Sequence, residues 1–296
     1  MNRPVRILSV SFKPNGADAM LSVLGSSVGG GYDLVIMPET CMGNQNEGLT
    51  ADSETVKAVQ KIAAEIKANV IFPLYTKRKK MKRINTALVI NRKGKIIASY
   101  RKLYPYWSEF DLEPPCAVTD GGDCVVDLDF GKIGLAICFD ANFPIVWQNI
   151  RERGAELVVW CSAYSAGMQL SAYSLIHHYP IVTCTQVPDT AVYDIDGREV
   201  MHKRGDDICL LDYEMDLDRC IFHHNFNKDK AAKLMEDHGE DIEIEKDYER
   251  EQWFILRSKN AGVSARELAA QYGMTELYVY KKDSLIKIDA MRVNIT

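Results

Sequence analysis

Residues 129–144 have the sequence DFGKIGLAICFDANFP, which gives the clearest indication of the fold. An apolar run from Gly134 to Cys138 predicts a buried strand, and a helix is expected from about Phe143. Cys138 therefore stands where a strand turns into a helix, at the sheet edge where ligands bind in α/β proteins. N–H groups at a helix terminus favour a thiolate, although a single strand cysteine is more often part of the core. Cys138 is a candidate nucleophile whose role depends on the residues around it.

Composition limits the class of protein. The chain has 296 residues, 47% of them hydrophobic, and a formal net charge of −5. An acidic chain presents no general surface for nucleic acid or anionic membrane, and no apolar run reaches the length of a membrane span. The eight cysteines include no C-x-x-C pair, and the first residues lack a signal-peptide pattern. We expect a cytoplasmic protein with no nucleic-acid or membrane partner.

Strand-like and helix-like segments alternate over the first two-thirds of the chain. Residues 53–67 repeat apolar positions at the helical period, and the turn signals at residues 91–94 and 196–197 predict hairpins. Strands are expected at Val5–Phe12, Asp33–Met37, Ala68–Tyr75, Cys124–Phe130, Lys132–Cys138, Ala155–Trp160 and Tyr179–Gln186. This order predicts an α/β fold in which helices cover a mostly buried sheet.

The last third of the chain has a different character. Residues 236–251 carry nine acidic and two basic side chains, which predicts a solvated surface or a mobile acidic arm. Ser264 and Glu267 form a capping-box pattern that predicts an amphipathic helix, packed on the body or on a neighbouring subunit. We expect a domain over residues 1–215 and a C-terminal helical extension over residues 216–296.

Three polar residues follow three of the predicted strands. Glu39 follows the run at residues 34–38, Lys102 follows the strand that ends near Tyr100, and Cys138 ends its own strand. A carboxylate, an ammonium group and a thiol at one sheet edge suit acyl transfer. The carboxylate takes the thiol proton, and the ammonium group lowers the thiol pKa and then stabilises an oxyanion.

Residues 34–40, 100–103 and 129–144 resemble, in this order, the three signature regions of the nitrilase superfamily of carbon–nitrogen hydrolases. The run Gly154–Val159 is similar to the strand that follows the nucleophile helix in that family. The resemblance covers residues 5–215. It implies an αββα sandwich that pairs into a four-layer αββααββα dimer, so a homodimer or higher homo-oligomer is expected.

The resemblance also implies roles for individual residues. Glu39 would be the general base, Lys102 the oxyanion-stabilising residue and Cys138 the nucleophile. The backbone N–H of Phe139 would be the second oxyanion donor. No metal or organic cofactor is implied.

The family has a further glutamate between the lysine and the cysteine, several residues before a Thr-Pro-Gly turn. Residues 118–121 resemble that turn, which favours Glu113. Glu109 is the alternative, because the pair Pro114-Pro115 leaves the alignment open.

The substrate class follows from the residues after the nucleophile. Phe139-Asp140 is more like the amidase and carbamoylase branches than the nitrile-cleaving Trp-Glu pattern, so a small amide or N-carbamoyl substrate is preferred to a nitrile. Trp160, Ser162 and Ala163 follow the next strand and are expected to line the pocket with Phe139.

The chain departs from the family at two places. Residues 145–147 are Ile-Val-Trp where Glu and Arg are common, and His177-His178 stand where many members carry Glu-Asn. The two histidines mark an unusual pocket or a divergent branch with altered activity, although adjacent histidines do not chelate a metal easily and structural or solvent roles are favoured for them.

One alternative function comes from the tail. Residues 265–275 resemble the first helix and turn of a helix-turn-helix, with a second helix through Tyr280, which would suit a DNA-linked regulator. The second helix is mostly apolar and lacks exposed Arg or Asn, so a hydrolase is the favoured reading.

Overall fold

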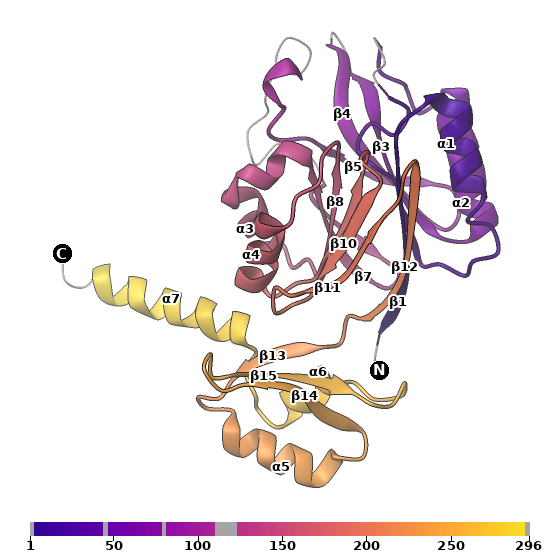
Figure 1. The fold of residues 1–296 in the computed structure, drawn as a ribbon. Helices are drawn as coiled ribbons and strands as arrows, with labels where there is room; N and C mark the ends of the chain where they lie inside the picture. The colour runs from indigo at the N-terminus through magenta and orange to yellow at the C-terminus, as the bar shows by residue number, and fades with distance from the viewer. Residues whose placement is uncertain (1–2, 44–46, 79–80, 110–122, 294–296) are drawn as a thin grey trace. The chain divides into compact units, whose positions relative to one another are not determined.

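A computed structural model describes residues 3–43, 47–78, 81–109 and 123–293 (Figure 1). Internal contacts divide the chain into one unit of Val5–Glu214 and a second unit of Met215–Thr296 with Met1–Pro4. Each unit has a hydrophobic core of its own. In the described part of the chain, no helix is both long enough and apolar enough to cross a membrane.

The first unit contains two six-stranded sheets. The first has the strand order β12 (Ile208–Asp216), β1 (Pro4–Phe12), β2 (Leu34–Ile36), β3 (Asn69–Arg78), β4 (Met81–Ile90) and β5 (Ile96–Arg101). The second has the order β11 (Glu199–Arg204), β10 (Asp189–Tyr193), β9 (Ile181–Thr185), β8 (Leu157–Ser162), β7 (Gly131–Ile137) and β6 (Val125–Leu128). In each sheet three neighbouring strands are parallel, namely β1-β2-β3 and β7-β8-β9.

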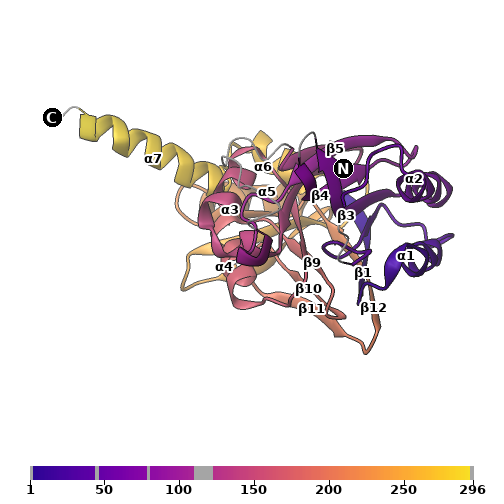
Figure 2. The ribbon, with the colours of Figure 1, turned by 90° about the horizontal axis from the view of Figure 1, so that it is seen from above.

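The two sheets face each other and carry helices on their outer faces (Figures 1 and 2). Helices α1 (Gly16–Gly25) and α2 (Glu54–Ile66) pack on the first sheet, and α3 (Pro144–Glu152) and α4 (Met168–His177) lie over the second. Between the sheets, Ser9 Oγ donates to the carbonyl of Thr183 at 2.7 Å. The layers therefore run α, β, β, α, which confirms the sandwich expected from the sequence.

A glycine lets α3 approach the strand that leads to the candidate nucleophile. A Cβ atom on Gly134 of β7 would lie 2.4 Å from Cγ2 of Ile150 on α3, closer than real contacts allow. Any larger side chain would push α3 off β7 and move the turn between them. The glycine in the signature stretch therefore serves close helix–sheet packing.

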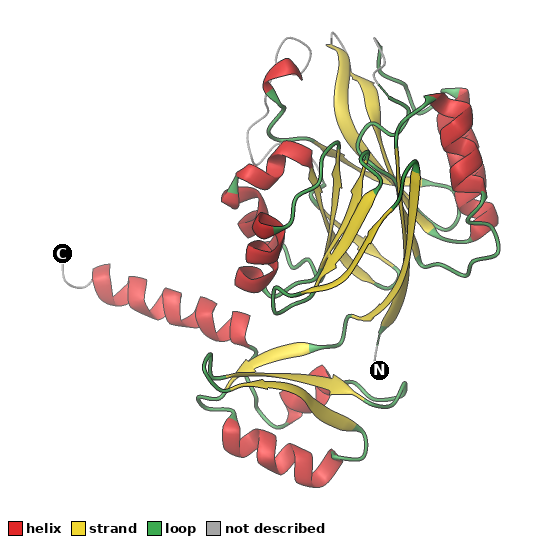
Figure 3. Cartoon of the chain, in the orientation of Figure 1, coloured by secondary structure: helices red, strands yellow, loops and turns green. Residues whose placement is uncertain are grey.

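The second unit is a small α/β fold (Figure 3). Its antiparallel sheet has the order β13 (Cys220–His223), β15 (Trp253–Ser258) and β14 (Ile242–Tyr248). With α5 (Lys228–His238), α6 (Ala265–Gln271) and α7 (Leu277–Val293), the chain order is β-α-β-β-α-α. The first five elements match a split β-α-β arrangement, and a single bridge from Glu276 to Phe222 occupies the place of its last strand.

The expectation of an acidic arm is wrong, and the expected helical extension contains the strands β13, β14 and β15 as well as helices α5, α6 and α7. Residues 236–251 form the end of α5 and strand β14. The acidic side chains of this strand pair with arginines of the same unit, Arg219 with Glu245 at 2.7 Å and Arg257 with Glu243 at 2.5 Å. Ion pairing and the buried Ile242 allow this charged segment to fold as a strand.

The predicted helix start at Ser264 is confirmed, since Ser264 Oγ accepts from the Glu267 N–H at 3.0 Å. The helix it starts, α6, packs its Ala265 and Ala269 into the core of its own unit. The next helix, α7, extends well beyond Tyr280, where the second helix of the helix-turn-helix pattern was expected to end.

Candidate active site

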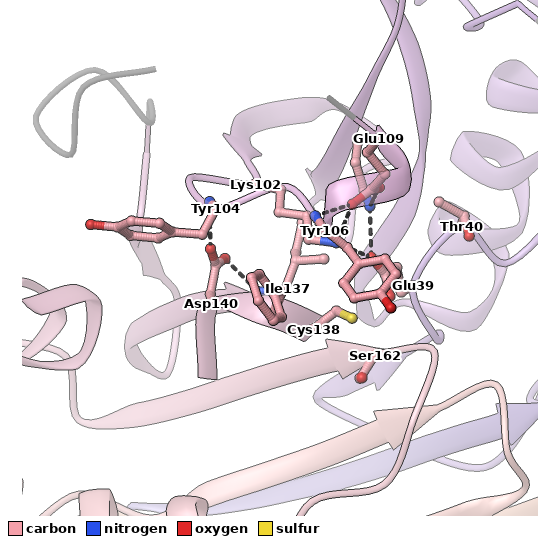
Figure 4. Close-up of polar contacts among 12 residues, drawn as sticks. Glu39, Thr40, Lys102, Tyr104, Tyr106, Glu109, Ile137, Cys138, Asp140 and Ser162 are labelled. Carbon is pink, nitrogen blue, oxygen red and sulfur yellow. Dashed lines mark hydrogen bonds and ion pairs between the residues drawn. The ribbon is translucent and has the colours of Figure 1, made fainter. Parts of the chain in front are cut away.

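The three polar residues of the sequence prediction meet in one pocket. Glu39 lies past the end of β2, Lys102 directly after β5, and Cys138 directly after β7 (Figure 4). Because the two sheets face each other, strand ends from both contribute to the same edge. All three side chains line a pocket of about 640 Å³.

Lys102 is the centre of a buried ion-pair network. Its Nζ lies 2.9 Å from Glu39 Oε1 and 2.7 Å from Glu109 Oε2. Burial acts to lower the pKa of Lys102, but Glu39, Cys138 and Glu109 outweigh it and raise the pKa above its ordinary value. An ammonium group has three N–H donors, so two carboxylates leave one for a further acceptor.

Glu109 lies inside this network. It ends the short 3₁₀ helix Trp107–Glu109, and its Oε2 also accepts from the Tyr106 backbone N–H at 2.7 Å. Burial acts to raise the pKa of Glu109, but the charge of Lys102 outweighs it and the pKa is lowered. Glu113, the other candidate for the second glutamate, lies outside the described residues.

Asn85 links the two glutamates. This side chain on β4 is fully buried, and its Nδ2 donates to Glu39 Oε1 at 2.7 Å and to Glu109 Oε1 at 3.1 Å. Its backbone carbonyl also accepts from the Lys102 N–H at 3.0 Å. One asparagine thus fixes the spacing of three charged groups.

Glu39 has one carboxylate oxygen that the network does not use. Its Oε1 accepts from Lys102 and Asn85, whereas its buried Oε2 has no N–H or O–H partner in the described residues. The interaction of Glu39 with the Cys138 thiol is among the causes that raise the pKa of that thiol. A buried carboxylate oxygen without a donor is well suited to accept a proton.

The backbone that carries Glu39 is held from the opposite sheet. Gln186 follows β9, and its Nε2 donates to the Glu39 carbonyl at 2.6 Å and to Thr40 Oγ1 at 2.9 Å. Thr40 has a φ of +39°, a conformation that a β-branched residue rarely adopts. The contact with Gln186 stabilises this strained turn.

Cys138 is also in a strained conformation. Its φ is +48°, and its carbonyl accepts from Trp160 Nε1 at 3.1 Å. Burial and then the charge of Glu39 raise the pKa of Cys138 to about 12. A raised pKa favours the protonated thiol, from which a neighbouring base would have to take the proton. Lys102 does lower this pKa, but by less than burial and Glu39 raise it.

Asp140 connects the turn that carries Cys138, after β7, to the segment after β5. The carboxylate is fully buried and accepts from the Ile137 N–H at 2.9 Å, the Tyr100 hydroxyl at 2.8 Å and the Tyr104 N–H at 3.0 Å (Figure 4). Burial raises the pKa of Asp140 to about 6, although the three hydrogen bonds act to lower it. The Trp147 indole donates to the Asp140 carbonyl at 3.3 Å, which gives a structural role to this departure from the family pattern.

The predicted substrate contacts are only partly found in the pocket wall. Phe139 and Ala163 line the pocket. Trp160 and Ser162 are fully buried and lie behind the wall, where Trp160 supports Cys138 and Ser162 Oγ accepts from the Tyr164 N–H at 3.0 Å. Neither side chain lines the pocket, so a direct contact with substrate is not supported.

Several residues of the site were missed in the sequence. Asn85, Asn142, Gln169 and Gln186 were not identified, and the last three line the pocket. Asn85 has a detectable signal, since it is a polar residue in β4 shortly before the apolar run Ala87–Ile90. The other three stand in loops or at a helix start, where polar residues are common.

His177 and His178 lie at the end of α4. The His177 ring stacks on Tyr173 and Tyr179, and His178 has a φ of +55° at the helix C-cap. Neither lines the pocket, which favours the structural interpretation. Among the described residues, no group of three or more His, Cys, Asp or Glu side chains is arranged to hold a metal ion.

Comparison with known proteins agrees with this geometry. A hydrolase of Schizosaccharomyces pombe is 29% identical over 164 residues, covering 50% of this chain and 49% of that protein. A formamidase of Bacillus cereus is 35% identical over 86 residues, covering 27% of this chain and 24% of the formamidase. The chain thus matches about half or less of the length of these relatives.

Comparison with solved structures aligns a larger part of the chain than comparison with the sequences of relatives does. A Saccharomyces cerevisiae member of branch 10 of the nitrilase superfamily aligns with a TM-score of 0.64 and 17% identity, over 72% of this chain and 90% of that one. The sequence model of the family described as carbon-nitrogen hydrolase matches residues 11–221, well over half of the chain. This match shows that the chain belongs to the carbon–nitrogen hydrolase family.

Proposed function

We propose that the chain hydrolyses the carbon–nitrogen bond of a small amide or N-carbamoyl compound through a thioester on Cys138. The observation that carries this proposal is the buried Oε2 of Glu39, which accepts from no N–H or O–H group of the described residues and lies in the same pocket as the Cys138 thiol. A thiol with a pKa of about 12 needs such a base, because almost no thiolate is present at neutral pH.

In the acylation half, Glu39 takes the Sγ proton as sulfur attacks the carbonyl carbon. The carbonyl electron pair moves to oxygen, where the third N–H of Lys102 and the backbone N–H of Phe139 stabilise it. Glu39 then gives its proton to the leaving nitrogen as the C–N bond breaks. Because the proton moves onto Glu39 as charge moves onto substrate oxygen, the net charge of Glu39, Lys102 and Glu109 with the substrate stays at −1.

In the deacylation half, water attacks the thioester carbon. We assign the second glutamate to Glu109, since its carboxylate binds Lys102 and lies in the pocket wall. A glutamate accepts the water proton, the C–S bond breaks, and the proton returns to Cys138 sulfur. The products are a carboxylic acid and ammonia or an amine; a carbamoyl substrate gives carbamic acid in place of the carboxylic acid.

The amide class is supported by Phe139-Asp140 after the nucleophile and by the partial similarity to a formamidase. Nitrile hydrolysis at the same site is the alternative. The sandwich fold also supports a homodimer of this chain, and the free thiols of the seven described cysteines suit a reducing compartment such as the cytoplasm.

The test is an ammonia-release screen over amides, N-carbamoyl amino acids and nitriles, with intact-mass detection of an acyl adduct. Cys138→Ala should abolish both turnover and adduct. Cys124→Ala, which removes a thiol outside the pocket, is the matched control and should keep both. Turnover by the Cys138→Ala protein would contradict the proposed nucleophile.

A further inference from the structure

One wall of the pocket is built from aromatic rings. Phe139 and Tyr106 both line the pocket, and their ring centroids lie 5.5 Å apart in an edge-to-face arrangement. Tyr106 contacts Trp107 in the same way at 5.6 Å, and Phe139 contacts Phe143 at 5.6 Å. We define the aromatic wall as these four side chains, Tyr106, Trp107, Phe139 and Phe143, of which Tyr106 and Phe139 line the pocket and the other two pack against them.

This wall is held in place by the catalytic network. The Tyr106 N–H donates to Glu109, and the stacking of Phe143 on Tyr104 at 3.6 Å joins it to the Asp140 hydrogen bonds. Rings fixed in this way lose little entropy when a ligand packs against them. The wall is a preorganised surface.

The exposed part of the wall faces outward from the nucleophile. Tyr106 is 42% and Trp107 67% exposed, whereas Cys138 is only 7% exposed. Tyr106 lines the pocket and Trp107 packs against it, so the two exposed rings form an apolar surface next to the pocket. A group attached to a carbonyl at Cys138 would meet these rings on its way out of the pocket.

The size of the pocket also indicates that a bound substrate is large enough to reach these rings. A volume of about 640 Å³ falls in the range of roughly 300–1,000 Å³ that is typical of sites for drug-sized ligands. An acyl group of one or two carbons would leave most of that volume to water. Tyr75 and Tyr164 add two further rings to the lining.

We infer that the aromatic wall is an acyl-group subsite and that the substrate is an amide whose acyl group carries an aromatic ring. This inference rests on the proposed amide hydrolysis at Cys138. Edge-to-face and offset contacts with a planar ring distinguish such a substrate from a saturated one of similar size.

The experiment compares 3-phenylpropionamide, 3-cyclohexylpropionamide and propionamide in wild type, Tyr106→Leu and Tyr106→Phe. In wild type, kcat/KM should be at least tenfold higher for the phenyl compound than for either of the others. Tyr106→Leu should reduce this preference about tenfold, while Tyr106→Phe should retain it. Equal kcat/KM values for the phenyl and cyclohexyl compounds, or an unchanged preference in Tyr106→Leu, would overturn the inference.

A binding measurement separates this inference from the catalytic proposal. Calorimetric titration of Cys138→Ala with the same three amides should give the tightest binding for the phenyl compound, weakened about tenfold by adding Tyr106→Leu. If wild type hydrolyses no amide but Cys138→Ala still binds the phenyl compound selectively, the catalytic proposal fails and the subsite stands. If amides are hydrolysed without aromatic selectivity in binding or turnover, the subsite fails alone.

Discussion

Lys102 Nζ lies closer to Glu109 Oε2, at 2.7 Å, than to any other carboxylate oxygen that it is found to contact. Both side chains are buried, and breaking such a pair leaves an uncompensated charge. Lys102 therefore depends on its ion pair with Glu109 as much as on its ion pair with Glu39, the proposed base.

Glu109→Gln should therefore reduce kcat/KM for the best amide by roughly 10²–10³, because the neutral side chain neither fixes Lys102 nor accepts a proton from water. Steady-state kinetics of this variant beside Glu113→Gln gives the comparison. Glu113→Gln should change kcat/KM less than about threefold. The reverse pattern would assign the second glutamate to Glu113.

Asn85→Ala should move the acid limb of the kcat/KM profile to higher pH. The amide of Asn85 lowers the pKa of Glu109, so its removal raises that pKa and the ionised form is lost at a higher pH. We expect a shift of roughly half to one pH unit.

The matched control is Asn69→Ala, which removes a buried asparagine from neighbouring β3, where it bonds Asp129 at 2.8 Å. That variant should lose stability without moving the acid limb. Identical pH profiles for Asn85→Ala and wild type would show that Asn85 only supports the fold.

Glu39→Gln should uncouple thiol reactivity from hydrolysis. The charge of Glu39 raises the pKa of Cys138, so its removal increases the thiolate fraction at a given pH. The rate of Cys138 alkylation by iodoacetamide at pH 8, followed by peptide mass spectrometry, should rise several-fold while amide turnover is lost.

Lys102→Met is the opposing variant in this experiment. It removes a charge that lowers the thiol pKa, so alkylation should slow. Faster alkylation in both variants would mean that access, rather than charge, limits the reaction.

Asp140→Asn should change how stability depends on pH. The folded-state pKa of Asp140, about 6, lies above the ordinary value of 3.8. The folded protein therefore holds this proton more tightly, so stability from this group is present below about pH 4 and is lost as pH rises to about 6. A difference of about two pKa units corresponds to roughly 3 kcal/mol.

The free energy of unfolding, measured in urea at pH 4.5 and pH 7, gives the comparison. Relative to Asp140→Asn, wild type should lose roughly 2 kcal/mol between these two pH values. Asp127→Asn, at an exposed position on β6, should follow the wild-type curve. Parallel curves for wild type and Asp140→Asn would rule out a raised pKa.

The main features of the fold were visible in the sequence because they depend on local pattern. Apolar runs ending at Cys138 and before Glu39 predicted central strands, and both residues lie at the ends of such strands. Charge counting failed over residues 236–251, because a strand can carry acidic side chains when arginines of neighbouring strands and turns pair with them.

The sequence allowed us to predict residues that each supply one chemical group, such as a thiol or a carboxylate. It did not allow us to predict how these groups change each other's pKa or which neutral side chains hold them. The raised pKa of Cys138 follows from its burial and from the nearby charge of Glu39, which no sequence pattern records. Likewise, Asn85 and Gln186 are neutral residues whose importance lies in which charged groups they reach.

Gln186 follows a strand of the second sheet, yet it holds the main chain of Glu39, which follows a strand of the first. The carboxylate of Glu39 and the sulfur of Cys138, which we propose to be the proton acceptor and the nucleophile, therefore stay aligned only while the two sheets keep their separation. A substitution in the inter-sheet core can change this spacing by a few tenths of an ångström. We expect such a change to slow the proposed proton transfer before it lowers the fraction of folded protein. The proposed turnover should therefore depend strongly on how closely the two six-stranded sheets pack.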